Sequence, residues 1–310
     1  AASDEEKALL TAPIEESQTT KGVLATTVRD DKGLDHITAG PAGKENRCES
    51  SACTEVEGAP WFSSKGAVRY VRREGWAKNE MAIYEWKVGS AEPHRLYATS
   101  DLLIDCKPID DDVLCGREGP THPRYLSRID LRTGKSVPLF DPNPTFGTLK
   151  FGNVERQLWR NDQGIECFGD LVYPPDYQPG RRYPLIVVQY ESRGFLRGGT
   201  GDEYPVQLFA RAGYLVLNVQ RPRSPLYGLG LSSIERQRRQ NDGFMERRSI
   251  LSTIETKVRQ LIDAGVADPE RIGITGLSDG STTVQYAALH SSLFKAAVVS
   301  GCCWEPSQSW

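Results

Sequence analysis

The sequence predicts an incomplete β-propeller followed by an α/β domain, and three observations support this prediction. Short runs that alternate polar residues with aromatic or β-branched ones fill the first half of the 310-residue chain. A weak internal repeat relates parts of that half to each other. In the second half, continuous apolar runs alternate with helical segments. We therefore predict propeller blades over residues 1–155 and an α/β domain over residues 156–310.

The repeat has the length of a propeller blade. Residues 83–97, IYEWKVGSAEPHRLY, align without gaps on residues 126–140, LSRIDLRTGKSVPLF, and the REG of residues 73–75 recurs at 117–119. A period of roughly 40–45 residues with four short strands per unit is typical of a β-propeller. Gly134 is expected in the turn between a blade's outer strands, where a positive φ is needed. Only two or three units fit, so the propeller is incomplete.

The second half has the order of a β-α-β fold. The runs PLIVVQY (184–190), YLVLNVQ (214–220) and RIGITG (271–276) are predicted as strands buried in a sheet, and KAAVVSG begins a fourth. Helices are predicted between and after them, the longest running from about Phe244 to a cap at Gly265. This order predicts a mostly parallel sheet covered by helices.

Composition and charge argue against several classes of partner. The net charge of −3 provides no basic field for nucleic acid or an anionic membrane. The arginines of IERQRRQNDGFMERRS are interrupted by acidic residues, so we interpret this segment as a solvated helix face. No apolar run approaches the ~20 residues of a membrane helix, and no signal peptide opens the chain. Without CxxC or paired-histidine spacing, neither a metal site nor a cofactor is predicted.

Four of the seven cysteines could form local disulfides. Cys48 and Cys53 flank a short loop, and Cys106 and Cys115 flank KPIDDDVL, which reads as a hairpin with an acidic turn. Two bridges would favour an oxidising compartment, and so the periplasm over the cytoplasm. Free buried thiols are the equal alternative. The adjacent cysteines 302 and 303 are interpreted as buried thiols.

The segment GITGLSDGSTT carries the predicted chemistry, with Ser278 between Gly276 and Gly280. A serine on a sharp turn between a strand and a helix projects its hydroxyl at the edge of the sheet. The amide of Asp279 then opens a helix and is free to stabilise an oxyanion. We therefore predict that Ser278 is a nucleophile. The alternative is a structural turn whose serine only caps the helix.

These residues resemble a known family. VADPERIGITGLSDGS is similar to the nucleophile segment of the prolyl oligopeptidase family of serine peptidases, and QRPRSPLYGLG resembles a loop of the same family. Within it, GLSDGSTTVQYAALHSSLFKAAVVSGCCWEP is most similar to lasso peptide isopeptidases. The resemblance implies an incomplete propeller capping an α/β-hydrolase catalytic domain of which residues 156–310 are the N-terminal part. Two departures are Ser281 after Gly280 and YESRGF in place of a glycine-rich turn.

The resemblance also implies roles for single residues. Ser278 matches the nucleophile, the Asp279 backbone N–H one oxyanion donor, and the Tyr190 hydroxyl a second donor. An amphipathic tyrosine packed at a strand end is the alternative for Tyr190. Glu191, Arg193 and Arg221 lie on loops at the same edge and are interpreted as solvated charges.

The general base is the missing part of the predicted site. Three of the four histidines, His36, His94 and His122, lie in propeller-type sequence, and His290 ends the helix behind Ser278. The family order is serine, acid, histidine. We therefore expect the acid and the histidine on a further C-terminal segment of the same protein, absent from this chain.

Three functions remain open at this point. The leading one is a serine isopeptidase that hydrolyses the bond between a lasso peptide's N-terminal amine and an Asp or Glu side chain, through an acyl-enzyme on Ser278. A general prolyl oligopeptidase or dipeptidyl peptidase acting on linear peptides is the second. A non-catalytic peptide-binding protein is the third.

Overall fold

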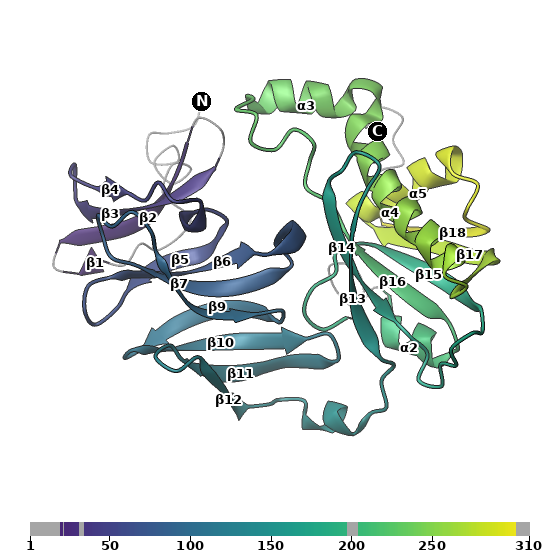
Figure 1. Cartoon of the computed structure of the whole chain (residues 1–310), viewed down its shortest axis with the longest axis horizontal. Coiled ribbons are helices and arrows are strands. Elements are labelled where there is room, and N and C mark those ends of the chain that lie inside the picture. Colours follow the sequence, from purple (N-terminus) through teal and green to yellow (C-terminus); the bar gives the residue numbers. More distant parts are fainter. Residues whose placement is uncertain (1–18, 21, 31–33, 197–203, 302–310) are drawn as a thin grey trace.

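The computed structural model describes residues 19–20, 22–30, 34–196 and 204–301. Within them, three four-stranded sheets precede one six-stranded sheet, and Figure 1 shows the small sheets stacked beside the large one. The predicted pair of cysteines at 302 and 303 lies outside the described residues.

Each small sheet is an antiparallel meander of four consecutive strands, which is the topology of a propeller blade. We call them blades 1, 2 and 3. The strands of blade 1 are β1 (Thr19–Thr20), β2 (Val23–Arg29), β3 (Asp35–Pro41) and β4 (Asn46–Arg47). Those of blade 2 are β5 (Val56–Phe62), β6 (Val68–Glu74), β7 (Glu80–Trp86) and β8 (His94–Thr99). Those of blade 3 are β9 (Leu102–Ile109), β10 (Asp112–Gly119), β11 (His122–Asp130) and β12 (Lys135–Phe140).

The sequence repeat corresponds to equivalent strands of blades 2 and 3. Residues 83–97 cover the β7–β8 hairpin, and residues 126–140 cover the β11–β12 hairpin. Gly134 has the predicted positive φ, 70°, in the latter turn. Apolar side chains of neighbouring blades pack against each other, with Tyr70 and Trp86 of blade 2 contacting Ile37 of blade 1 in one buried cluster. The three sheets are consistent with the predicted propeller.

The six-stranded sheet has the order β13-β14-β16-β15-β17-β18. Its strands are β13 (Val154–Arg160), β14 (Glu166–Val172), β15 (Tyr183–Tyr190), β16 (Leu215–Gln220), β17 (Ala267–Leu277) and β18 (Ala296–Ser300). The last four in the order are parallel, whereas β13 and β14 are antiparallel additions. The sheet is therefore mostly parallel among the strands that the apolar runs predicted. The predicted boundary at residues 155 and 156 falls inside β13 and stays a prediction.

Helices lie on both faces of this sheet. The helices that pack on the sheet are α2 (Val206–Arg211) on one face, with α4 (Met245–Asp263) and α5 (Asp279–His290) on the other. The helix α3 (Ser233–Asn241) contacts α4. Alternate residues of one strand serve the two faces: Val187 of β15 packs in the cluster that includes α4 and α5, whereas Val188 packs in the cluster that includes α2. This burial on both faces explains why the strand is a continuous apolar run.

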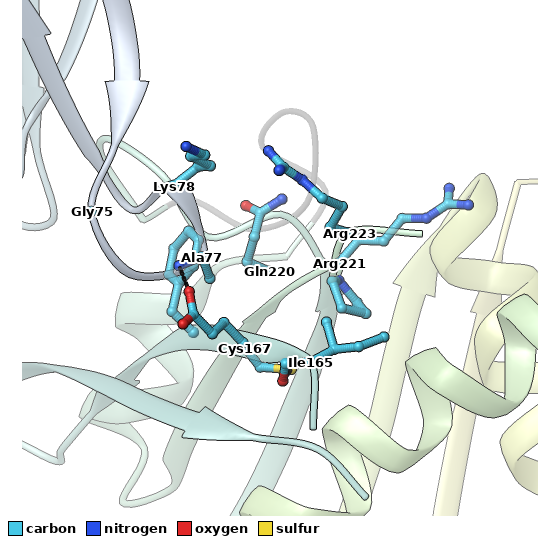
Figure 2. A pocket seen from close by; sticks show the side chains of 11 residues that line it. Gly75, Ala77, Lys78, Ile165, Cys167, Gln220, Arg221 and Arg223 are labelled. Carbon is cyan, nitrogen blue, oxygen red and sulfur yellow. Dashed lines mark hydrogen bonds between the residues drawn. The ribbon is translucent and has the colours of Figure 1, made fainter. Parts of the chain in front are cut away.

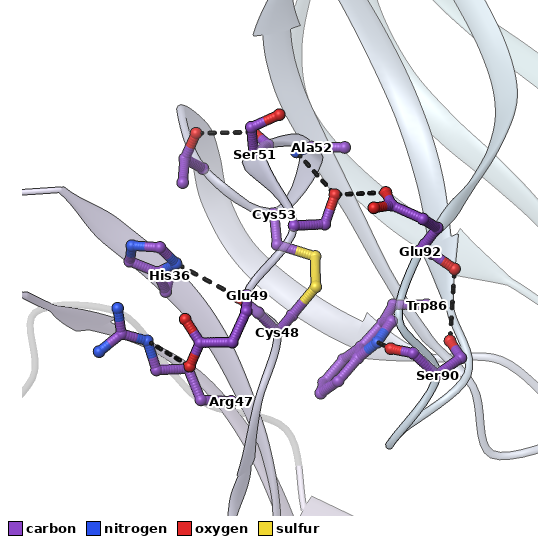
Figure 3. Close-up of a disulfide and its surroundings, with 12 residues drawn as sticks. His36, Arg47, Cys48, Glu49, Ser51, Ala52, Cys53, Trp86, Ser90 and Glu92 are labelled. Carbon is purple, nitrogen blue, oxygen red and sulfur yellow. Dashed lines mark hydrogen bonds and ion pairs between the residues drawn. A yellow bond between two sulfur atoms is a disulfide. The ribbon is translucent and has the colours of Figure 1, made fainter.

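Two disulfides lie in the part of the chain that forms the blades. Cys48 and Cys53 are joined across a turn that begins blade 2, and Cys106 and Cys115 are joined between β9 and β10. Figure 3 shows the first bridge beside the Trp86 ring. The disulfide alternative is thus the correct one for both pairs, while Cys167 is a free buried thiol. No helix of the described part is long and apolar enough to cross a membrane.

Candidate active site

Ser278 occupies a sharp turn between β17 and α5. Its backbone angles, φ 54° and ψ −120°, lie in a region that residues with a side chain rarely adopt. Such strain persists only where the surrounding structure enforces it, and it concentrates at functional sites. The turn is therefore the strand-to-helix elbow that the GxSxG pattern predicts, with the serine at the carboxyl edge of the parallel strands.

The glycine two residues before the serine allows this turn. A Cβ placed on Gly276 would come within 2.5 Å of backbone atoms of Gly280, so strand and helix pass too closely for any side chain. Small residues also bring α5 down onto the sheet, since Ser281 and Thr283 are fully buried. The turn and the helix packing thus depend on the same few small residues.

A charge cluster holds the helix that follows Ser278. The Asp279 carboxylate accepts hydrogen bonds from Arg221 at 2.8 Å and from Arg247, and Arg247 also donates to the Thr283 hydroxyl at 3.0 Å. Arg221 reaches Glu246 at 2.7 Å. A carboxylate at the first position of a helix is favoured by the helix dipole. These contacts tie the loop after β16, α4 and α5 together directly beside Ser278.

Two sequence interpretations need correction here. Arg247 and Glu246 belong to the arginine-rich segment interpreted as a solvated face, yet the Arg247 side chain is only 11% exposed. Arg221, interpreted as a solvated loop charge, is engaged at both ends by carboxylates. Both arginines are drawn inward because the negative charge of Asp279 has to be balanced at a partly buried position. In the sequence, the aspartate directly after Ser278 was the feature that could have indicated these arginine contacts.

The backbones of the two residues predicted to supply oxyanion donors lie at the same edge of the sheet. Asp279 is the first residue of α5, and the first amides of a helix have no partner within it. Tyr190 ends β15, where it pairs with Gln220 of β16, while Gln189 pairs with Gly276 of β17. The Tyr190 backbone is thus one strand away from the elbow, and its side chain is outside what the structure describes.

The four histidines are all described, and none accompanies Ser278. His36 is buried in blade 1, where it contacts Asp30 and the Cys48 carbonyl. His94 and His122 lie on blade strands, the latter paired with Asp141. His290 stacks near Tyr286 at the far end of α5, about 18 Å along the helix from the elbow at ~1.5 Å per residue. No described histidine can serve as the general base.

A cavity of about 380 Å³ opens between blade 2 and the carboxyl end of β16. Blade 2 contributes Gly75, Ala77 and Lys78, and the loop after β16 contributes Arg221 and Arg223. Figure 2 shows Lys78 and Arg223 facing each other across this space with Gln220 between them. Since Arg221 also binds Asp279, the cavity adjoins the charge cluster beside the nucleophile.

Polar contacts from blade 2 and the disulfide-bridged turn border the cavity. The Trp76 indole donates to the Cys167 carbonyl at 2.9 Å, and the Ala77 amide donates to Glu166. Glu55 accepts hydrogen bonds from Arg223 and from the Tyr227 hydroxyl. Burial and the hydrogen bond to Glu55 raise the pKa of Tyr227 to about 12. Nothing in the sequence pattern indicated these contacts, because they join residues more than 85 positions apart.

Among the described residues, no group of three or more histidine, cysteine, aspartate or glutamate side chains could hold a metal ion. Ser278 is exposed and lies next to a helix amide, an arrangement suited to attack on a carbonyl group.

Comparison with known proteins supports the resemblance noted from the sequence. Residues 203–306 match the model of the prolyl oligopeptidase family. The chain is 42% identical over 262 residues to the lasso peptide isopeptidase AtxE2 of Asticcacaulis excentricus, covering 84% of this chain and 38% of that protein. It thus spans about two fifths of the length of this curated relative. The resemblance to a lasso peptide isopeptidase is confirmed.

Solved structures agree with this similarity. The structure of AtxE2 without ligand matches with a TM-score of 0.86 and 38% identity, over 98% of this chain and 48% of that one. A serine-to-alanine variant of AtxE2 with Astexin3-dC4 bound matches equally well. Dipeptidyl peptidase 4 of Porphyromonas gingivalis matches with a TM-score of 0.64 at 18% identity, over 91% of this chain and 40% of that one, and shows the shared fold alone.

Proposed function

We propose that the protein containing this chain is a serine isopeptidase that linearises lasso peptides. The observation that carries the proposal is the strained elbow at Ser278, in a chain that is 42% identical to a lasso peptide isopeptidase over 262 residues. The blades form an incomplete propeller beside a partial α/β-hydrolase domain, as the family match over residues 203–306 supports.

In the proposed mechanism, the Ser278 hydroxyl attacks the carbonyl carbon of the isopeptide bond. The Asp279 amide, and the Tyr190 hydroxyl as a second donor, stabilise the negative charge that develops on the carbonyl oxygen. The N-terminal amine of the peptide takes up the proton that the general base removed from Ser278 and leaves, and water then hydrolyses the acyl-enzyme to release the Asp or Glu side chain. The charge cluster around Asp279 keeps α5, and so its first amide, in place.

A serine needs a general base to attack at neutral pH. Since no described histidine reaches Ser278, we propose that the histidine and its acid partner come from residues C-terminal to this chain. The match to only 48% of the AtxE2 structure leaves room for them in the whole protein. Labelling of Ser278 by a fluorophosphonate in the whole protein, but not in a variant lacking that histidine, would support this.

We also propose that the protein acts in an oxidising compartment, with the periplasm favoured. Two disulfides, Cys48–Cys53 and Cys106–Cys115, support this, because such bridges are rare where thiols are kept reduced. Alkylation of protein taken from periplasmic and cytoplasmic fractions without reduction tests it. The cysteines at these four positions are expected to resist alkylation only in the periplasmic fraction.

The test of the proposed function is incubation of the whole protein with a lasso peptide and with its linear form. Hydrolysis adds one water to the lasso peptide and yields a linear chain, both of which mass spectrometry detects. The Ser278→Ala variant is expected to be inactive. Cleavage of linear peptides with the lasso peptide left intact would instead identify a general oligopeptidase.

A further inference from the structure

We propose that the cavity between blade 2 and β16 is a subsite for a carboxylate group of the peptide, bound by Lys78. The inference deepens the proposed function and rests on it, because it names a feature of the substrate that the same site recognises. Its chemical content is narrow: an anionic oxygen pair, either on an acidic side chain or at the peptide's C-terminus.

Lys78 is held at the cavity wall by an unusual turn. Ala77 and Lys78 both have positive φ values, 48° and 61°, although neither is glycine. The turn is maintained by the hydrogen bonds of Trp76 and Ala77 to β14. Two consecutive strained residues are costly, and such strain persists where the surroundings impose it. Contacts between blade 2 and the six-stranded sheet therefore hold this lysine in place.

The Lys78 ammonium is available to a ligand. In the part of the chain that the structure describes, its side chain makes no hydrogen bond or ion pair, although the Glu55 and Glu74 carboxylates act on it at longer range, whereas neighbouring cations are paired. Arg223 is paired with Glu55, and Arg221 with Glu246 and Asp279. Burial lowers the pKa of Lys78, which reflects partial loss of water around the charge. An ammonium that is partly desolvated and has no direct hydrogen-bond partner can donate a charge-assisted hydrogen bond to an anion.

The other polar side chains of the cavity lining provide hydrogen-bond donors, and the carboxylate among them is already paired. The Gln220 side-chain oxygen already accepts from the Ser192 amide at 3.1 Å and from Arg193, so its NH₂ group is left to donate. Figure 2 shows Lys78, Gln220 and Arg223 converging on the same space. The one carboxylate of the lining, Glu166, accepts from the Ala77 amide and pairs with Arg160. The cavity thus selects an anion over a cation.

The position of the cavity fits a peptide that is being cleaved at Ser278. Gln220 ends β16, and β17, which leads to Ser278, lies two strands away in the sheet with β15 between them. Two interstrand spacings are about 10 Å. An extended peptide covers this distance with about three residues. The bound carboxylate is therefore expected close to the scissile bond, within the same compact peptide.

The experiment measures binding separately from hydrolysis, with the whole protein carrying Ser278→Ala. Labelled Astexin3-dC4 is titrated by fluorescence anisotropy in three forms: unmodified, with a C-terminal amide, and with its acidic side chains converted to amides. Loss of one carboxylate is expected to weaken binding about tenfold, the size of a charge-assisted contact. Which form loses affinity identifies the source of the carboxylate.

Variants of Lys78 then assign the effect. Lys78→Gln is expected to remove the preference for the carboxylate form, and Lys78→Arg to retain it. Lys87→Gln, at an exposed lysine of the same blade, is the matched control and should leave the preference unchanged. Circular dichroism and thermal unfolding of each variant establish that it is folded.

The outcomes separate this inference from the proposed function. A Lys78→Gln protein that keeps the preference, or equal binding of all three peptide forms, would overturn the subsite. Hydrolysis of the lasso peptide by the unmodified protein is measured alongside. Hydrolysis without carboxylate preference contradicts only the subsite, and Lys78-dependent binding without hydrolysis contradicts only the proposed function.

Discussion

The blades and the six-stranded sheet are held together by different means. The six-stranded sheet buries apolar side chains on both faces, and one continuous cluster joins β13 to α4 and α5. The blades bury smaller clusters between neighbouring sheets and add two disulfides and many ion pairs. Cross-links of this kind compensate for a limited core. We infer that the blades depend on bonds between particular residues, whereas the helix-covered sheet depends on close packing around its backbone.

The largest expected effect is on the elbow itself. Ser278→Ala should lower kcat by roughly 10⁴–10⁶-fold, as removal of a serine nucleophile does in related chemistry, with little change in stability. Ser278→Gly should be equally inactive but more stable by about 1 kcal/mol, because glycine tolerates the positive φ. Kinetics with thermal unfolding check both. Equal stability of the two variants would argue against a strained elbow.

Gly276→Ala tests whether packing positions Ser278, the proposed nucleophile. The added Cβ meets the Gly280 backbone at 2.5 Å, so strand or helix has to shift. A displacement of about 1 Å is expected to cost on the order of 100-fold in kcat. Gly147→Ala, at a glycine without positive φ and with no atom near the added Cβ, is the control and should leave kcat unchanged. Unchanged activity in Gly276→Ala would contradict the packing account.

Removing a disulfide should affect the blades and leave the chemistry intact. The double variant Cys106→Ser, Cys115→Ser is expected to lose about 2–3 kcal/mol in free energy of unfolding, from the greater freedom of the unfolded chain. The Cys48–Cys53 loop is shorter, with a separation of 5 residues against 9, so its loss should be a few tenths smaller. Urea denaturation followed by tryptophan fluorescence measures this. A larger loss from the shorter loop would show that native contacts dominate.

The charge cluster at Asp279 belongs to the helix-covered sheet, but, like the blades, it depends on bonds between particular residues. Asp279→Asn keeps the shape of the side chain but leaves Arg247, 11% exposed, without its carboxylate. A loss of about 1–2 kcal/mol in stability is expected, with a lower kcat if α5 shifts. Arg239→Gln breaks an exposed ion pair on α3 and should cost under about 0.5 kcal/mol. Equal losses in the two variants would mean that the cluster is no more than a surface network.

The smallest effect is expected at the contact between the loop after β16 and Glu55. The folded-state pKa of Tyr227, about 12, is above the ordinary value of about 10. Its contribution to stability is therefore complete below pH ~10 and is lost as the pH rises toward 12. Tyr227→Phe should abolish that alkaline loss and cost under about 1 kcal/mol at neutral pH. Unfolding measured between pH 9 and pH ~12 tests the sign.

Much of the fold could be predicted from local pattern. Strand alternation and the repeat at residues 83–97 and 126–140 predicted the blade hairpins, and apolar runs predicted β15, β16 and β17. The hairpin between Cys106 and Cys115 was predicted as well, although whether the thiols were oxidised was left open. These features depend on residues near each other in sequence, which is why a period or a spacing reveals them.

The candidate site also has features that the local sequence predicts and features that depend on distant residues. The strand-to-helix turn at Ser278 could be predicted from the sequence alone, because Gly276, Ser278 and Gly280 act within one turn of backbone. The inward turn of Arg247 and Arg221 to Asp279, and the place of Lys78 at a cavity wall, depend on tertiary packing and could not be predicted in this way. The sequence gives the charge of a side chain. Its partners depend on strands and helices that are distant in sequence and that the packing of different sheets brings together.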